Sequence, residues 1–164
     1  MGLDQYLYAR KYVSSSNYGR DADGNYTNTP NEAFDEIIKA MDISRDEVRE
    51  DHPSLNLELE VGYWRKANAI HQWFVNEVQS GEDDCKDYYV SREQLIELRD
   101  LCQQVVDNPD DAEELLPTQG GFFFGDTTYD EWYFSSVKDT IEILDKILNN
   151  SKFDEWDFKY TSSW

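Results

Sequence analysis

The segment Tyr63-Trp-Arg-Lys-Ala-Asn-Ala-Ile-His-Gln-Trp-Phe-Val-Asn-Glu-Val78 has the clearest periodicity in the sequence. Its apolar residues recur at steps of three and four, the spacing that places side chains on one face of an α-helix. The members of this stripe are Tyr63, Ala67, Ile70, Phe74 and Val78. The pattern predicts a helix over 63–78, whose apolar face needs a sheet or further helices to pack against.

Other segments supply those packing partners. Alternation of apolar and polar residues predicts strands at 3–13, 55–61 and 153–161. Helical spacing and capping residues predict further helices at 32–41, from Ser44, at 91–107, after Pro109 and at 131–149. We expect a long loop at 14–31 and a short buried strand at 120–125, between glycine hinges. The sequence therefore predicts an α+β fold: a small, mostly antiparallel sheet covered by three main helices in a single domain.

The net charge is the strongest global feature. Thirty-five Asp and Glu against 15 Lys and Arg leave a formal charge of −20, while aromatic residues reach 15% and can build the core. A field of this sign repels DNA, RNA and anionic lipid. We therefore expect no direct binding of nucleic acid or membrane. The partners left are basic proteins, cations, or ligands held in a local pocket.

Cysteine usage and the absence of targeting signals indicate the compartment. Cys85 and Cys102 stand in no metal-binding spacing, so both are expected to be reduced thiols of a cytoplasmic protein. No basic segment followed by an apolar stretch marks a signal peptide, and no apolar run approaches the 18 or so residues that would span a membrane.

One basic and aromatic cluster stands out in this acidic chain. Trp64, Arg65 and Lys66 precede His71 on the predicted helix, and a planar or phosphorylated ligand could stack on the ring and pair with the cations. Further aromatic residues that could join this pocket are Tyr129, Trp132 and Tyr133. The alternative is that the rings belong to the core and the cations offset nearby carboxylates.

The acidic residues form three clusters at predicted helix ends and connectors. Duplex DNA carries about one charge per 110 Å² of surface, whereas an even spread of this protein's net charge gives only about one per 420 Å². Imitation of DNA therefore requires the carboxylates to converge on one face; the alternative is an ordinary solubilising surface. The clusters comprise Glu82, Asp83, Asp84, Asp87, Asp107, Asp110, Asp111, Glu113, Glu114, Asp126, Asp130 and Glu131.

Metal binding and catalysis find little support. Asp21, Asp23, Asn25 and Glu32 have the 1, 3, 5 and 12 spacing of a calcium loop, but glycine stands at the fourth position instead of the sixth. A plain Asp/Asn-rich turn is favoured, and no metal or cofactor is expected. The chain has only 2 histidines and no ordered nucleophile, base and acid, so a non-enzymatic function is favoured.

Four segments together carry a family resemblance: residues 1–13, 60–75, 116–125 and 129–134. With them the chain resembles an uncharacterised family of short acidic proteins encoded by bacteriophages and prophages. The resemblance implies an accessory phage protein in a bacterial cytoplasm, with a variable loop and short-helix insertion at about 14–54. It carries no functional residue over to this chain.

Three functions remain, in order of preference. The first is a phage accessory protein that inhibits a basic, nucleic-acid-binding host defence protein through an acidic surface that imitates DNA. The alternative is a pocket protein that sequesters a small nucleotide-like signalling molecule. The third is a small enzyme of unknown reaction.

Overall fold

The computed structural model describes residues 2–164 and divides the chain into two compact units. Unit 1 contains residues 2–10 and 59–164, and unit 2 contains residues 11–58. The predicted insertion at 14–54 therefore lies inside unit 2. Each unit has its own buried cluster, and each is described by itself below.

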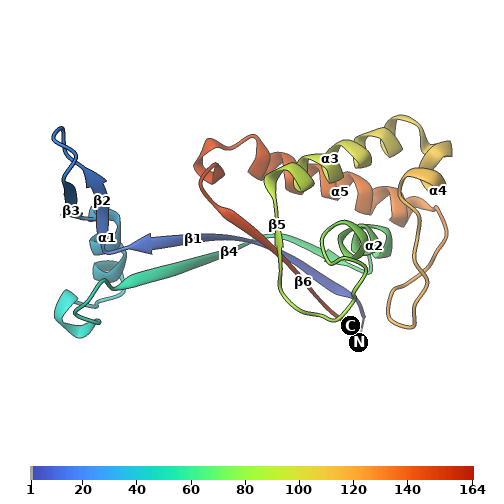
Figure 1. The fold of residues 1–164 in the computed structure, drawn as a ribbon. Coiled ribbons are helices and arrows are strands. Elements are labelled where there is room, and N and C mark those ends of the chain that lie inside the picture. Colours follow the sequence, from blue (N-terminus) through green and yellow to red (C-terminus); the bar gives the residue numbers. More distant parts are fainter. Residues whose placement is uncertain (1) are drawn as a thin grey trace. The chain divides into compact units, whose positions relative to one another are not determined.

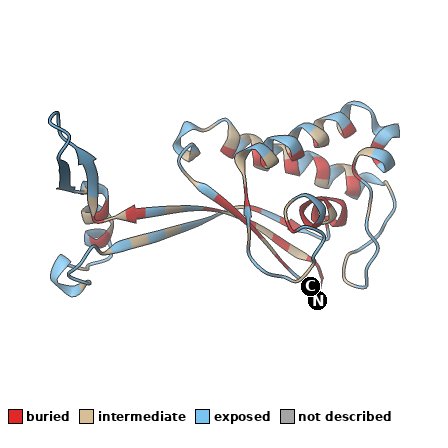
Figure 2. Cartoon of the chain, viewed as in Figure 1, coloured by how far each residue is buried: buried red, intermediate tan, exposed pale blue. Residues whose placement is uncertain are grey.

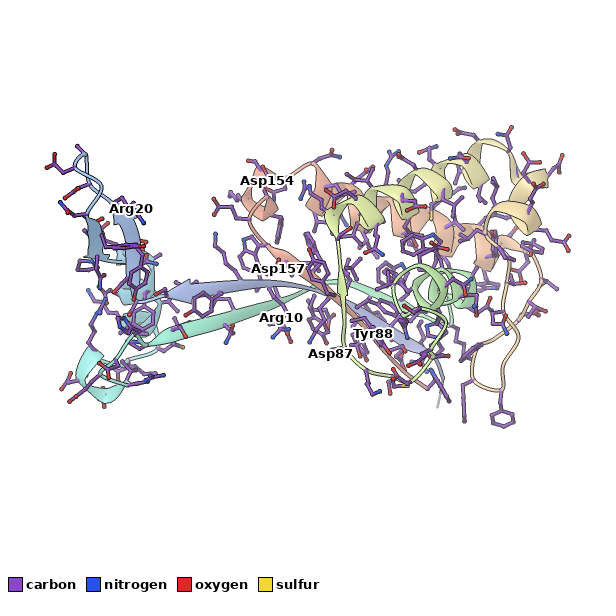
Figure 3. The ribbon with its side chains drawn as sticks, in the orientation of Figure 1. Arg10, Arg20, Asp87, Tyr88, Asp154 and Asp157 are labelled. Carbon is purple, nitrogen blue, oxygen red and sulfur yellow. The ribbon has the colours of Figure 1, made fainter. Side chains whose placement is uncertain are left out.

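Unit 1 is built on an antiparallel four-stranded sheet (Figure 1). The strand order is β4-β1-β6-β5, and the strands are β1 (Asp4–Ser14), β4 (Ser54–Arg65), β5 (Tyr88–Val90) and β6 (Asp157–Ser163). β6 is the last strand of the chain, yet it pairs with β1 on one side and β5 on the other. In this register Arg10 of β1 stands opposite Asp157 of β6 (Figure 3).

Four of the five helices of the described residues belong to unit 1. They are α2 (Asn68–Glu77), α3 (Arg92–Asp107), α4 (Ala112–Leu115) and α5 (Glu131–Leu148). The predicted helices at 91–107 and 131–149 are confirmed as α3 and α5, which lie along each other (Figure 1). The expected set of three main helices is incomplete, because α1 (Glu32–Ala40) and the short α4 are added to α2, α3 and α5. No helix of residues 2–164 is long and apolar enough to cross a membrane.

The core of unit 1 lies between the helices and one face of the sheet. Leu7 and Ala9 of β1 are fully buried, while the alternating Tyr6 and Tyr8 are only partly buried, as strand geometry requires (Figure 2). Phe74 of α2 stacks on Tyr160 of β6 with ring centroids 3.8 Å apart. Burial of such aromatic pairs supplies this acidic chain with its main stabilising term.

The helix predicted over 63–78 is wrong in its first turn. β4 continues through Arg65, and α2 begins only at Asn68. Gly62 and Trp64 are buried and Tyr63 and Arg65 exposed, so this segment alternates as a strand does. The partly buried positions from 55 to 61 are odd-numbered, so the alternation changes phase at Gly62. Aromatic residues suit a pleated strand as well as a helix stripe, and the neighbouring strand β1 decided between them.

The buried strand predicted at 120–125 is also wrong. These residues form a turn in the segment between α4 and α5, closed by the Phe124 N–H, which donates to the Gly121 carbonyl at 3.1 Å. Phe122 is 96% exposed. The glycines flanking the three phenylalanines thus favoured a turn. Conversely, the three-residue β5 was missed because it is too short to show alternation.

Unit 2 contains a hairpin where a long loop was predicted. β2 (Ser16–Arg20) pairs with β3 (Tyr26–Pro30), and nearly all of their residues are exposed (Figure 2). The turn is made by Asp21, whose Oδ1 accepts the backbone N–H groups of Asp23 and Asn25 at 2.9 Å each. Arg20, labelled in Figure 3, lies over the ring of Tyr26 at 4.4 Å. Side-chain hydrogen bonds within the turn thus stabilise a hairpin that composition alone presents as a loop.

The predicted helices of unit 2 are present. Asn31 caps α1 by accepting the Ala33 N–H at 3.1 Å, and Ser44 precedes the single 3₁₀ turn Arg45–Glu47 in the predicted capping-box arrangement. The buried cluster of this unit consists of Val13, Phe34 and Ile38.

Candidate ligand-binding site

A cavity of about 560 Å³ opens in unit 1, among the end of β4, the start of α2, the segment that follows α4, and the first half of α5. Its lining combines rings, hydroxyls and charges of both signs. The residues used below are Tyr63, Trp64, Arg65, Lys66, Asn68, Asp126, Asp130, Trp132, Tyr133 and Asp139.

Two cations stand at the junction of β4 and α2. Arg65 is the last residue of β4, and Lys66 follows in a left-handed conformation, with φ at +57°. That conformation is uncommon for a non-glycine residue. It is stabilised here by the Lys66 N–H, which donates to the Leu3 carbonyl at 2.7 Å. Both side chains are exposed, and neither has an ion pair among residues 2–164.

Asn68 connects the start of α2 to the segment between α4 and α5. Its Nδ2 donates to the carbonyl oxygens of Phe124 at 3.2 Å and Asp126 at 2.8 Å, and its Oδ1 accepts the Gln119 N–H at 3.1 Å. The side chain is only 4% exposed. These three side-chain hydrogen bonds all go to the segment between α4 and α5, so Asn68 fixes that segment against the start of α2.

The aromatic residues of the cavity differ in how exposed they are and in whether their polar atoms are hydrogen-bonded. Trp64 is buried, and its Nε1–H donates to Thr140 of α5 at 2.9 Å. The Tyr133 hydroxyl donates to the Leu116 carbonyl at 2.8 Å, and burial raises the pKa of this phenol. Trp132 is 79% exposed at the start of α5, more than Tyr63 at 43%, so its ring is the most accessible of these for stacking.

Three carboxylates line the cavity from other segments than the cations. Asp126 accepts the Thr128 N–H at 3.0 Å, and this backbone hydrogen bond keeps the pKa of its carboxyl below the ordinary value. Asp130 caps α5 through one oxygen, which accepts the N–H groups of Trp132 and Tyr133. Asp139 lies two turns further along α5. The lining therefore combines two cations with three carboxylates that lie on other segments.

Of the seven residues predicted for a pocket, five line this cavity: Trp64, Arg65, Lys66, Trp132 and Tyr133. Tyr129 and His71 do not. Tyr129 packs edge-on against Tyr133, with centroids 4.9 Å apart. The predicted placement of Trp64 and His71 on one helix face is wrong, because Trp64 belongs to β4.

His71 is completely buried in a polar chain that crosses the core of unit 1. Its Nδ1 lies 2.8 Å from the Tyr160 hydroxyl, which lies 3.2 Å from Gln5 Oε1. Its Nε2 lies 3.0 Å from Asp83, whose other oxygen accepts the Trp164 indole N–H. Since a carboxylate only accepts, the His71 Nε2–H is the donor. These hydrogen bonds fasten β6 to α2.

The three acidic clusters have three different environments. In the first, Asp83 bonds His71, Asp84 pairs with Lys86, and Asp87 pairs with Lys159. In the third, Asp126 and Asp130 line the cavity, and the exposed Glu131 begins α5. The second cluster is exposed throughout and has no ion pair among the described residues: Asp107, Asp110, Asp111, Glu113 and Glu114.

The calcium-loop candidates are explained by the hairpin. Asp21, Asp23 and Asn25 form its turn, while Glu32 is the first residue of α1. No group of three or more metal-ligating side chains occurs within residues 2–164.

Comparison with known proteins finds no matching family model, no matching curated protein and no matching solved structure. The phage-family resemblance of the four sequence segments therefore stays a prediction, and function is argued from the cavity.

Proposed function

We propose that this protein binds, in the cavity of unit 1, a small molecule that carries an anionic group and a planar ring, as a nucleotide does. The observation that carries the proposal is the pair Arg65 and Lys66, which have no ion-pair partner among residues 2–164 and line a cavity together with the exposed Trp132. The volume of about 560 Å³ lies within the usual range of small-molecule sites, about 300–1,000 Å³.

The chemistry of these side chains fits such a ligand. A guanidinium binds phosphate or carboxylate oxygens through two parallel hydrogen bonds, and an ammonium adds a compact charge. An indole face stacks on any of the nucleic-acid bases, because every base has a π-face. The surrounding net charge of −20 opposes distant attraction of anions. At physiological salt, however, screening limits that field to about 8 Å, and contacts inside the cavity dominate.

We propose binding rather than turnover. His71 is the one histidine of unit 1; it is enclosed in the core and does not line the cavity. If the protein acts in a phage-infected cell, as the resemblance implies, binding of this kind would sequester a nucleotide-like signalling molecule.

The test is calorimetric titration with ribonucleoside monophosphates at 150 mM salt, about the physiological ionic strength. We expect Arg65→Gln and Trp132→Ala each to weaken binding about tenfold or more. Lys138→Gln, on an exposed residue of α5 outside the cavity lining, is the matched control and should bind as the unaltered protein does. Equal affinity in Arg65→Gln and Lys138→Gln would refute the proposal.

A second candidate has its own observation: the five exposed carboxylates at 107–114, which have no cation paired to them in the described chain. We propose it as a surface for a basic, nucleic-acid-binding host protein. Excess protein should then displace DNA or guide RNA from a host defence complex at low salt. Replacement of these five by amides should abolish the displacement, while replacement of Asp83, Asp84 and Asp87 should not, because those three have partners within the chain. Failure of displacement from every complex tried at low salt would exclude this function.

A further inference from the structure

The cavity lining carries cations at the β4–α2 junction and carboxylates on other segments, and this restricts the ligand beyond the proposed function, on which this inference rests. An anionic group held by Arg65 and Lys66 must avoid the carboxylates on the other segments. Those carboxylates accept hydrogen bonds and donate none. A ligand that contacts both sets must therefore present an anion to the cations and hydrogen-bond donors to the carboxylates.

The carboxylates retain acceptor capacity for such donors. Asp130 uses only its Oδ1 to cap α5. The Asp139 side chain is exposed, with no hydrogen bond or ion pair to any residue from 2 to 164. Asp126 is ionised at neutral pH, since its backbone hydrogen bond lowers its pKa. These carboxylates thus offer several oxygens to hydroxyl or amino groups.

Hydroxyl-bearing side chains also belong to the cavity lining. Thr128, Ser135 and Ser136 line it together with the carboxylates. Ser136 already donates to the Trp132 carbonyl at 3.0 Å, which leaves its oxygen as an acceptor. A surface of carboxylates and hydroxyls beside an exposed indole is suited to a polyhydroxylated ring joined to a planar one.

We infer that the ligand is a ribonucleotide, with its phosphate at Arg65 and Lys66, its base on Trp132, and its ribose hydroxyls donating to Asp130 and Asp139. A carboxylate that receives ribose hydroxyls is a recurring element of nucleotide recognition. A deoxynucleotide lacks one of the donors and leaves a carboxylate oxygen unpaired in the complex. A nucleoside lacks the anion, and inorganic phosphate lacks both the ring and the hydroxyls.

Titration of the full chain with four probes separates these contributions: AMP, dAMP, adenosine and inorganic phosphate. We expect AMP to bind about tenfold more tightly than dAMP, because a hydrogen bond to a charged acceptor is lost. Adenosine and phosphate should each bind more weakly still. If adenine is not the preferred base, UMP, GMP and CMP are each compared with their own deoxy forms in the same way.

The variants Asp130→Asn and Asp139→Asn test the carboxylates. Asparagine caps helices as well as aspartate does, so Asp130→Asn should keep α5 intact. The variant that removes the acceptor of the 2′-hydroxyl should bring the ratio of the AMP and dAMP affinities close to one, while the other variant should weaken both nucleotides alike. Both variants should retain phosphate-dependent binding. Glu142→Gln, on an exposed α5 residue outside the lining, is the matched control and should keep the full ratio.

The outcomes are distinct. Binding of ribo- and deoxynucleotides with equal affinity, sensitive to Arg65→Gln, would overturn the ribose inference and leave the proposed function standing. Absence of binding for every nucleotide and for phosphate would overturn both. The ribo-to-deoxy comparison needs only the unaltered protein, so a variant that fails to fold does not prevent the test.

Discussion

The two units hold their structure in different ways. Unit 1 buries a hydrophobic cluster of 21 residues that joins segments from Leu7 to Tyr160, whereas the hydrophobic cluster of unit 2 holds only Val13, Phe34 and Ile38. Unit 2 relies on local hydrogen bonds, such as the Asp21 turn and the Asn31 cap. The difference shows that distant burial specifies unit 1, while short-range side-chain chemistry specifies much of unit 2.

The largest effect should come from the aromatic pair of the unit 1 core. Phe74→Ala removes a fully buried ring stacked on Tyr160 and should cost about 3–5 kcal/mol in the free energy of unfolding. Urea unfolding followed by tryptophan fluorescence measures this directly, because all 5 tryptophans lie in unit 1. Phe122→Ala, at a ring 96% exposed, is the control. Similar losses for the two variants would contradict this picture of the core.

The same substitution in unit 2 should affect that unit alone. Phe34→Ala removes the largest of its three buried side chains, so amide protection within residues 11–58 should fall about tenfold or more. Hydrogen exchange by mass spectrometry resolves the two units peptide by peptide. The tryptophan unfolding midpoint should not change. Equal loss of protection in residues 59–164 would show that the units unfold together.

The polar chain through the unit 1 core should contribute less than its apolar packing. Tyr160→Phe deletes the hydroxyl that lies between His71 and Gln5, and it should cost about 1–3 kcal/mol, because buried polar atoms lose their partner. Tyr89→Phe, at an exposed residue, should cost nothing measurable. A stabilising effect of Tyr160→Phe would mean that apolar packing at this position is more favourable than the hydrogen bonds of the hydroxyl.

The two cysteines should differ in their reactivity towards a thiol reagent, and this difference reports on the opening of unit 1. Burial raises the pKa of the Cys102 thiol from 9.0 to about 12, while Cys85 is exposed. The folded state therefore holds the Cys102 proton more tightly, and this contribution to stability is complete below pH 9 and lost as the pH rises toward 12. At neutral pH a thiol reagent should label the exposed Cys85 promptly and the buried Cys102 only when urea is added. Prompt labelling of both would show that unit 1 opens freely.

The smallest effect should come from the hairpin turn of unit 2. Hydrogen bonds from Asn25 lower the pKa of Asp21. The contribution of the Asp21 carboxylate to the stability of the turn is therefore present above the ordinary pKa of 3.8 and disappears as the pH falls through the lower pKa of the folded state. Asp21→Ala should speed amide exchange at 20–26 without moving the tryptophan midpoint. It should also remove the acid sensitivity of exchange in this turn. Unchanged exchange would mean that the cross-strand contact of Arg20 with Tyr26 is sufficient.

Local signals predicted the parts of the fold that local energies decide. Ser91 caps α3 as its spacing indicates, and the alternation of residues 3–13 forms β1. Residues 63–67 satisfied both a helix stripe and a strand period, and only the presence of β1 beside them resolved the choice. The hairpin of residues 16–30 was hidden because its strands are polar on both faces.

The cavity was predictable only in part. Arg65, Lys66 and Trp132 were recognisable as unusual residues in an acidic chain, but Asn68 carried no signal. Its importance arises from hydrogen bonds to residues more than 50 positions away, which sequence periodicity does not encode. His71 misled for the same reason, since its partners are Asp83 and Tyr160 and not the neighbouring cations.

The central place of β6 has a consequence for biosynthesis. β1 leaves the ribosome first, but the strand that separates it from β5 comes last, at 157–163. A nascent chain that stops before Asp157 exposes the edge of β1 and the apolar faces of α2, α3 and α5 to solvent. Unit 1 therefore acquires its sheet only as translation of these residues finishes, and until then the unfinished chain is at its most vulnerable to proteases and aggregation.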